Sequence, residues 1–331
     1  MRSRARGTSN HSSRLIAAGS TLGSLAALWL LDEQLGVGQC AQWLVDDYRG
    51  MLRTVHHQVV SPTLTEPINV TLNALTRPPP IGCLEWPAGR VLLQWCLDCL
   101  PLRNATILEI GSGIGTTAIG LALANDGQRT ARRVVATDAY DEVLDLLRAN
   151  ATLNGIDAIA GEASHLTVVK WDAAGGAESL ASLPVVASEL THIIGADLIY
   201  WGGADDAMRH HANDGLVSTL AQLCRAAPHV EVVLLCVARG PAKVPYNADT
   251  QVGDLPHRSA GFLSLDYFEA KCASHGLIAR RELLPEQTAD RVHRAQIFPL
   301  RAAWWLIGIW DSLVLYRVSL RPMDGSEPTS H

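Results

Sequence analysis

The sequence predicts an α/β protein with a doubly wound, Rossmann-like sheet of seven strands, and three observations indicate this fold. After residue 81, short apolar runs alternate with helical segments, a pattern typical of a mostly parallel sheet covered on both faces. The runs are continuous in valine, isoleucine and leucine, as expected for strands buried on both sides. A glycine-rich turn at residues 111–115 joins the first run to a helix, at the edge where such sheets bind ligands.

Composition excludes several other classes of protein. The chain of 331 residues is 48% hydrophobic and 18% charged, and its 27 glycines have no periodic spacing, which excludes disordered and fibrous proteins. The formal net charge of −6 argues against a protein that mainly holds nucleic acid, so we expect no specific nucleic-acid partner. The seven cysteines lie mostly in apolar runs and indicate reduced, buried thiols of an intracellular protein.

The first 31 residues differ from the rest of the chain. Arginines and serines are frequent before residue 15, and no acid precedes Asp32. Residues 15–31 then form an uncharged, mainly apolar run of about 17 residues, close to the lower limit for a membrane span. Three interpretations stay open: a mitochondrial presequence, a membrane-anchoring segment, or a tail followed by one buried helix. We expect a cytoplasmic protein, with a mitochondrial or membrane-anchored location as the alternative.

Residues 32–80 are expected to form a mainly helical N-terminal extension. The spacing of apolar residues predicts a helix from Asp32 to about Ser61, followed by a short strand at residues 68–72. Residues 77–80, which include three consecutive prolines, are expected to form a linker. The inner stripe of the helix would contain Leu35, Trp43, Leu44, Tyr48 and Leu52. The expected parts of the chain are residues 1–31, 32–80, 81–322 and a tail at 323–331.

The elements of the main domain follow from the apolar runs and the breaks between them. The expected strands are residues 106–110, 134–137, 166–171, 192–196, 230–238, 277–283 and 313–320. The expected helices are residues 116–124, 140–150 and 264–275, and another helix opens near Pro87.

The glycine turn suits S-adenosylmethionine better than a dinucleotide. A dinucleotide site would have its third glycine at position 116, but this chain has Thr116 there, and its third glycine is Gly115. S-adenosylmethionine has no pyrophosphate, and it needs space for a methionine moiety. Glu109, two residues before the turn, would supply a negative charge for the amino group of that ligand, directly or through water.

Each of the next three strands ends in residues that suit a nucleoside ligand. Asp138 would accept hydrogen bonds from the ribose hydroxyls, or it would cap the following helix. Trp171 and Asp172 would face adenine, and the alternatives are a core tryptophan and an aspartate in a turn. Asp197 and Tyr200 follow the strand that neighbours the first one, so they would face the reactive end of the ligand.

These residues, together with Leu84–Ala88 and residues 147–155, resemble the family-16 branch of seven-strand S-adenosylmethionine-dependent methyltransferases. Its members are mainly protein-lysine methyltransferases that act on non-histone proteins. The Trp171-Asp172 pair is most similar to the elongation factor 2 lysine methyltransferase and its relatives directed at heat-shock proteins. The resemblance covers residues 81–240 well, and residues 260–320 by strand pattern only.

The resemblance implies a seven-strand methyltransferase sheet with a cofactor site and a lysine channel beside it. Asp197 and Tyr200 would be the catalytic residues and would shape that channel. Trp86 would pack on the cofactor, and Ala196 would lie beside its methionine moiety. With the reasoning above, the expected cofactor-binding residues are Trp86, Glu109, Gly111, Ser112, Gly113, Gly115, Asp138, Trp171, Asp172 and Ala196.

The expected activity is therefore transfer of a methyl group from S-adenosylmethionine to a lysine of a non-histone protein, by a monomer. Methylation of RNA or of a small molecule stays open, as does a scaffold that binds the cofactor without turnover. The first 60 residues, residues 240–261 and the Trp304–Trp310 segment depart from the family, so the protein substrate is not predicted.

No metal is expected in this site. Cys96 and Cys99 lack the second, suitably spaced pair that a structural zinc site requires. Adjacent histidines such as His56 and His57 do not form a metal site, because neighbouring side chains diverge on a helix.

Overall fold

The computed structural model describes part of the 331-residue chain. The described residues are 52–75, 81–124, 131–156, 165–175, 180–183, 185–199, 206–237, 260–282, 284–285, 288 and 313–321. The predictions for residues 1–51, for the linker at 77–80, for Tyr200 and for the tail at 323–331 lie outside these residues. The Trp304–Trp310 segment and all but the last two residues of 240–261 lie outside them as well.

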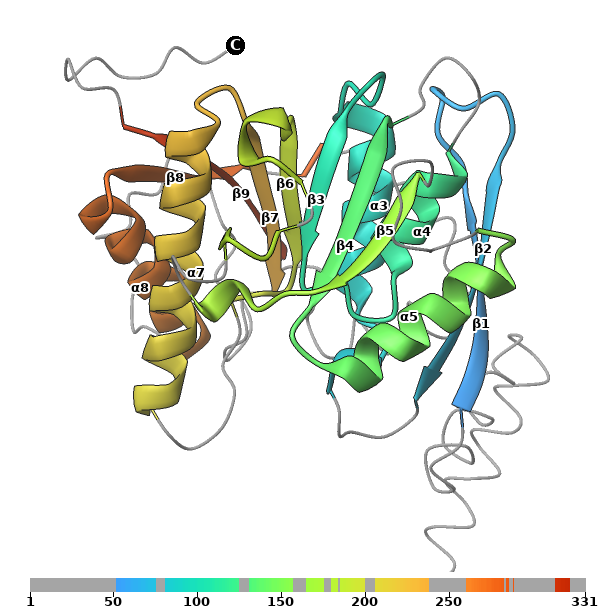
Figure 1. Cartoon of the computed structure of the whole chain (residues 1–331), viewed down its shortest axis with the longest axis horizontal. Helices are drawn as coiled ribbons and strands as arrows, with labels where there is room; N and C mark the ends of the chain where they lie inside the picture. Colours follow the sequence, from blue (N-terminus) through green and yellow to red (C-terminus); the bar gives the residue numbers. More distant parts are fainter. Residues whose placement is uncertain are drawn as a thin grey trace, which may run out of the picture.

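A seven-stranded sheet forms the centre of the molecule, as predicted (Figure 1). Its strands are β3 (Thr106–Ile110), β4 (Arg133–Asp138), β5 (Leu166–Lys170), β6 (His192–Ala196), β7 (Glu231–Val237), β8 (Leu277–Glu282) and β9 (Leu313–Leu320). The order across the sheet is β5-β4-β3-β6-β7-β9-β8. The first five strands in that order are parallel, and β9 runs antiparallel to both of its neighbours. The expected strand bounds are each correct to within one residue.

Helices cover both faces of this sheet, which confirms the doubly wound prediction. The helices are α3 (Pro87–Cys99), α4 (Thr116–Leu123), α5 (Asp141–Leu153), α7 (Asp206–Ala226) and α8 (Ala260–Ser274). Successive strand residues pack on opposite faces: Ile107 belongs to the buried cluster that contains α3, α4 and α5, and Leu108 to the cluster that contains α7 and α8. Two-sided burial explains why the parallel strands are mainly apolar runs.

Residues 52–59 are a strand, so the predicted helix is wrong over this part. Strands β1 (Leu52–Val59) and β2 (Ile68–Leu75) form an antiparallel hairpin, which confirms the strand expected from residue 68. Leu52, Val55 and Val59 have the spacing of a helical stripe, but the side chains alternate in exposure, and Leu52 is 54% exposed. Period-two alternation is the pattern of a half-buried strand.

The hairpin packs on α4 and α5 (Figure 1). Val70, Leu72 and Ala74, on the inner face of β2, are buried in the same cluster as α3, α4 and α5. The hairpin therefore shares the hydrophobic core of the sheet and its helices.

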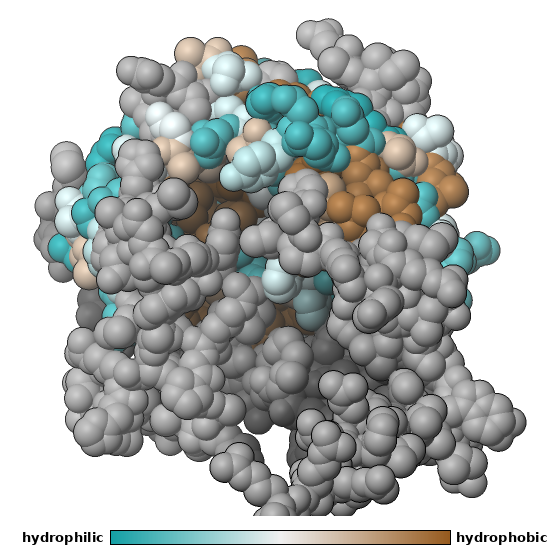
Figure 2. Space-filling model, turned by 90° about the horizontal axis from the view of Figure 1, so that it is seen from below, coloured by the Kyte–Doolittle hydropathy of each residue, from teal (hydrophilic) through white to brown (hydrophobic). Residues whose placement is uncertain are grey.

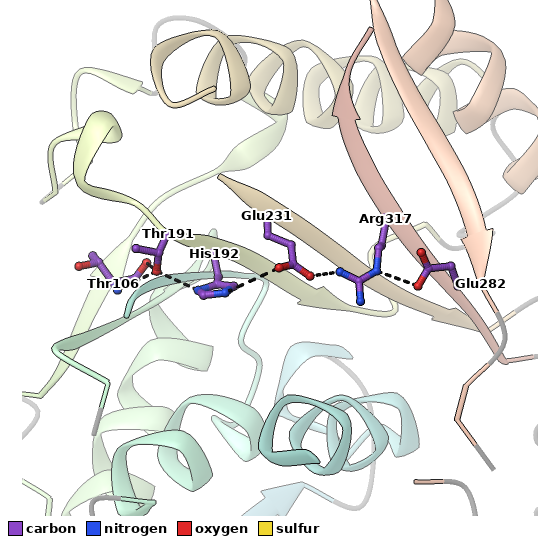
Figure 3. Close-up of polar contacts among 6 residues, drawn as sticks. All are labelled: Thr106, Thr191, His192, Glu231, Glu282 and Arg317. Carbon is purple, nitrogen blue, oxygen red and sulfur yellow. Dashed lines mark hydrogen bonds and ion pairs between the residues drawn. The ribbon is translucent and has the colours of Figure 1, made fainter. Parts of the chain in front are cut away.

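A chain of polar contacts crosses the sheet near the amino ends of β3, β6 and β7 (Figure 3). His192 Nε2 lies 3.9 Å from Glu231 Oε2, and burial lowers the pKa of His192. Arg317 donates to Glu231 and, over 2.7 Å, to Glu282 Oε2. The Arg317 guanidinium also lies 5.4 Å from the ring centroid of Trp95 on α3. These contacts lie at the edge of the sheet opposite the one where such sheets bind ligands. We therefore interpret them as contacts that stabilise the fold.

Arg317→Met is expected to lower the free energy of unfolding by about 1–2 kcal/mol, because it removes two ion pairs and a contact with an aromatic ring that are only partly screened by solvent. Unfolding in urea measures this change. Arg148→Met is the control: Arg148 forms an exposed pair with Asp145, worth less than about 0.5 kcal/mol. Equal urea midpoints for the two variants would contradict a stabilising role for the Arg317 contacts.

Candidate functional site

The turn between β3 and α4 requires its glycines. Gly111, Gly113 and Gly115 have φ values of 63°, 54° and 93°, left-handed conformations that glycine adopts without strain. A Cβ at Gly113 would lie 3.1 Å from the carbonyl oxygen of Gly82, and one at Gly115 would lie 2.8 Å from Ile119 Cδ1. The turn therefore has neither the backbone conformation nor the space for larger residues at these positions.

Hydrogen bonds hold the turn against the end of β4. The Ser112 amide donates to the Thr137 carbonyl over 2.8 Å, and the Thr137 amide donates to Ser112 Oγ over 3.1 Å. The Gly113 amide donates to Asp138 Oδ2 over 3.2 Å. Ser112 is 8% exposed, so its side chain shapes the turn from within.

Asp138 lies at the carboxyl end of β4, as predicted, with its carboxylate beside the glycine turn. Its Oδ1 accepts a hydrogen bond from the Tyr140 amide over 3.3 Å. The helix-cap alternative is wrong, because Tyr140 is the N-cap residue of α5. Burial raises the pKa of Asp138, the amides of Gly113, Tyr140 and Ala139 oppose that rise, and Asp172 adds to it. A carboxylate oxygen accepts more than one hydrogen bond, so Asp138 keeps capacity for ligand hydroxyls.

Trp171 is a core tryptophan, so the structure does not support a ring that faces adenine. Its side chain belongs to the buried cluster with α7 and α8, and the residue is 3% exposed. The physical reason is that the residue after β5 turns toward the covered face of the sheet. Asp172 is exposed, and its Oδ1 accepts from the Ala174 amide over 2.8 Å. The alternative expectation of an aspartate in a turn is therefore correct, although Asp172 stays near Asp138.

Glu109 lies buried below the turn, 2% exposed, so its carboxylate does not reach the surface where a ligand would contact it directly. Burial raises its pKa from an ordinary value of 4.5 to about 7, and the Asp138 carboxylate adds to that rise. The Thr117 and Ser112 hydroxyls and the Ala118 amide oppose it. Within the described part of the chain, Glu109 Oε2 has no hydrogen-bond partner. A negative charge here would act on the turn and on the start of α4 through its field.

The end of β6 lies beside the glycine turn, as predicted from the order of the strands. Ala196 is half-buried, and Asp197 is 9% exposed with a φ of 56°. A non-glycine residue in that conformation is uncommon and is often found at functional sites. Leu198 folds back over Gly111: a Cβ on that glycine would come within 2.5 Å of Leu198 Cδ2. Tyr200, the other predicted catalytic residue, lies outside the described residues.

Trp86 is the half-buried N-cap residue of α3. The preceding residue, Glu85, forms ion pairs with the hairpin. His57 Nε2 lies 2.6 Å from Glu85 Oε1, and Arg53 Nη2 lies 3.4 Å from Glu85 Oε2. Burial acts to raise the pKa of Glu85, but His57, Arg90 and Arg53 hold it at about 2. Sequence reasoning missed this cluster, because no local pattern links His57 to a residue on another element.

The rim around Asp138 is accessible. Tyr140 is 62% exposed, and Asp172 is exposed. Viewed from below, the described surface carries hydrophobic residues next to hydrophilic ones (Figure 2).

The described residues contain neither a metal-binding cluster nor a membrane-spanning helix. No group of three or more His, Cys, Asp or Glu side chains in them is placed to hold a metal ion. None of the helices in the described ranges is both long enough and apolar enough to span a membrane; the apolar run at residues 15–31 lies outside these ranges.

The strand order, the glycine turn after β3 and the carboxylate after β4 define the class of this protein as a Rossmann-like, doubly wound α/β fold. A family model described as lysine methyltransferase matches residues 68–246. The chain belongs to this lysine methyltransferase family, which confirms the predicted resemblance and makes the protein a methyltransferase. The family implies S-adenosylmethionine as the methyl donor.

The solved structures that the chain matches at low identity include the following two. Ribosomal protein L11 methylase from Lactobacillus delbrueckii subsp. bulgaricus is 16% identical, with a TM-score of 0.37, over 70% of this chain and 77% of that one. The CcbJ methyltransferase from Streptomyces caelestis is 14% identical, with a TM-score of 0.41, over 74% of this chain and 94% of that one. No curated protein matches the sequence.

Glu109→Gln is expected to stabilise the protein at alkaline pH. Because folding raises the pKa of Glu109 from 4.5 to about 7, the folded state favours the protonated form. The associated stability is fully present below pH 4.5 and is lost as the pH rises through 7. Glutamine does not ionise, so its advantage over the wild type is expected to grow to about 3 kcal/mol at pH 8.

Urea unfolding from pH 5 to pH 8.5 measures the difference in stability between Glu109→Gln and the wild type. Glu142→Gln, at an exposed carboxyl group, is the control and is expected to follow the wild type. A difference between Glu109→Gln and the wild type that stays constant with pH would show that Glu109 does not titrate in this range.

Proposed function

We propose that this chain is an S-adenosylmethionine-dependent protein-lysine N-methyltransferase that acts on a non-histone protein. Membership of the lysine methyltransferase family supports this proposal. The observation that carries it is the Gly113–Asp138 hydrogen bond, which brings the glycine turn and an acceptor carboxylate together at one edge of the sheet. Ala196 and Asp197 reach the same edge from β6.

The residues at this edge fit the expected cofactor. Asp138 would accept hydrogen bonds from the paired ribose hydroxyls, which suit a carboxylate acceptor. The turn at residues 111–115 would let backbone approach the ligand, since its glycines carry no side chains. Glu109 below the turn favours a positively charged ligand, because an opposite charge stabilises its ionised form. When bound, S-adenosylmethionine would supply a methyl group on a positively charged sulfur: a neutral amine would attack the methyl carbon in line, and the sulfur would leave as the neutral thioether S-adenosylhomocysteine.

The protein's part in the reaction is to present a neutral lysine amine in the correct position. A lysine ammonium has a reference pKa of about 10.4 and must lose a proton before it can attack. Enclosure among apolar and aromatic groups lowers that pKa by desolvation. Asp197 would orient the amine through its carboxylate, and Tyr200 would line the channel. We assign no general base, and water would take the proton.

Asp138→Ala is expected to weaken binding of S-adenosylmethionine by at least about 10- to 100-fold, because the loss of even one hydrogen bond to a charged acceptor costs about 1.5–3 kcal/mol. Calorimetry with S-adenosylmethionine and S-adenosylhomocysteine measures the Kd. Asp138→Asn, which keeps the shape and one acceptor oxygen, is expected to bind with intermediate affinity.

The control for this experiment is Asp141→Ala, because Asp141 lies three residues after Asp138 and is an exposed acid paired with Lys170. This variant should bind like the wild type. Unchanged affinity in Asp138→Ala would refute the ribose role of Asp138. Absence of heat for the wild type with both ligands would refute the proposed function itself.

Asp197→Ala is expected to abolish methyl transfer and to leave the Kd for S-adenosylmethionine within about threefold of the wild type. Asp197→Asn is the second variant, because asparagine tolerates the left-handed backbone at this position and lacks the charge. Transfer is measured with labelled cofactor and a cell lysate that lacks the protein. A parallel loss of binding and transfer in both variants would contradict a role confined to the amine.

The chemical nature of the labelled product decides the substrate class. We expect label in material that is sensitive to protease, and mass spectrometry should find it on lysine. Label in material sensitive to nuclease, or in small molecules that pass a filter, would replace the protein substrate with RNA or a metabolite. Binding of the cofactor without labelled product would favour the scaffold.

A further inference from the structure

Two asparagines of α5 bind the backbone of β2 in the N-terminal hairpin. Asn154 Oδ1 accepts from the Thr71 amide over 2.9 Å, and its Nδ2 donates to the Thr71 carbonyl over 2.6 Å. Asn150 Oδ1 accepts from the Asn73 amide over 2.7 Å, and its Nδ2 donates to the Asn73 carbonyl over 3.0 Å. Each side-chain amide therefore takes the place of one residue in a neighbouring strand.

The spacing of these pairs matches the geometry of the two elements. Four residues along a helix rise about 6 Å, and two residues along a strand rise about 6.8 Å. Residues two apart in a strand present their amides and carbonyls to the same edge. Asn150 and Asn154 therefore satisfy the edge of β2 that faces away from β1, and they fix how the hairpin lies along α5.

Asn150 makes one contact that Asn154 does not make. The second hydrogen of Asn150 Nδ2 is donated to the carbonyl of Ile114 over 2.9 Å, whereas Asn154 Nδ2 donates to the carbonyl of Asn150 in its own helix over 2.7 Å. Ile114 lies within the glycine turn, next to Gly113. Asn150 is 0% exposed, and a buried polar group that loses its hydrogen-bond partner is costly. One buried amide thus joins the hairpin, α5 and the turn.

The hairpin is also attached to the segment before α3. His57 and Arg53 of β1 hold Glu85, the residue before Trp86. Both sequence segments expected to contact the cofactor, residues 84–88 and 111–115, are therefore linked to the hairpin by buried polar contacts. The family match begins at residue 68, in β2, so the strand that binds Asn150 lies inside it.

We propose that the N-terminal hairpin is a working part of the cofactor site and that it holds the glycine turn in its binding shape through the chain Asn73–Asn150–Ile114. This inference rests on the proposed function, because the turn is taken to bind S-adenosylmethionine. Asn150 is a positioning residue: it acts on the ligand through Ile114 and the adjoining backbone. Loss of this link loosens the turn and weakens cofactor binding beyond any loss of overall stability.

The test compares Asn150→Ala with its matched control Asn154→Ala, since each removes one asparagine pair with β2. Hydrogen exchange of the ligand-free protein measures the turn directly, over a peptide that contains residues 111–115. We expect exchange in the turn to accelerate about tenfold or more in Asn150→Ala and to stay within about twofold of the wild type in Asn154→Ala. The Kd for S-adenosylmethionine should rise about tenfold or more in Asn150→Ala alone.

A second pair of variants tests the hairpin without altering α5. Asn73→Pro removes the amide that donates to Asn150, and Thr71→Pro removes the amide that donates to Asn154. Proline is tolerated where a strand amide faces away from its partner strand. Faster exchange in the turn is expected for Asn73→Pro and not for Thr71→Pro. This pair also decides the question if Asn150→Ala does not fold.

Four outcomes separate the hypotheses. Equal exchange rates in the turn for Asn150→Ala and Asn154→Ala would overturn the inference, and so would an unchanged turn in Asn73→Pro. A wild type that binds no S-adenosylmethionine would refute the proposed function, while the exchange measurements would still decide whether the hairpin holds the turn. Slower turnover at an unchanged Kd in Asn150→Ala would also contradict the positioning role.

Discussion

The turn at residues 111–115 is restrained from several directions, and the arrangement of the site depends on that restraint. β4 holds it through Ser112 and Gly113, and α5 holds it through Asn150. Gly82 lies close to the turn on another side. Its glycines adopt backbone angles that other residues avoid, so the surrounding contacts both require glycine and leave the turn few alternative shapes. A turn ordered before the ligand arrives reduces the conformational entropy that binding must overcome.

The sheet was predictable because strands that are buried on both faces have a recognisable sequence pattern, a continuous apolar run. The five parallel strands are mainly apolar runs between breaks, and the bounds of every strand from β3 to β9 could be placed to within one residue. β8 is the exception in composition, because only its first three residues are apolar. The first strand of the hairpin has no such continuous apolar run. β1 exposes one face, and Leu52, Val55 and Val59 fall at intervals that also suit a helix. Local spacing cannot distinguish these cases, because the partner that decides between them is β2, which lies beyond a turn.

The candidate site was predictable where its function depends on a residue's position at a strand end. Asp138, Ala196 and Asp197 lie where the order of strands places them. Trp171 is also next to a strand end, but its burial depends on how α7 packs against that face, which no local pattern reveals. Contacts between distant parts of the chain could not be predicted for the same reason. Asn150 and its partner Asn73, for example, are 77 residues apart in the sequence.

Glu85 and Glu109 show how the neighbours of a buried carboxyl group decide its charge. Burial acts to raise the pKa of both groups. His57, Arg90 and Arg53 reverse that effect at Glu85 and hold its pKa at about 2. Among the described residues, the groups that shift the pKa of Glu109 include no basic side chain, and that pKa is raised to about 7.

The carboxyl group of Glu109 therefore lacks a compensating cation in the described part of the chain, and it lies directly below the turn that would receive a positively charged ligand. A cation bound above the turn would favour the ionised form of Glu109. Ionised Glu109 destabilises the folded protein when no ligand is bound. A bound cation would reduce this destabilisation, because it interacts favourably with the ionised carboxylate. A residue that weakens the fold at neutral pH can in this way strengthen the selectivity of the site for a cation.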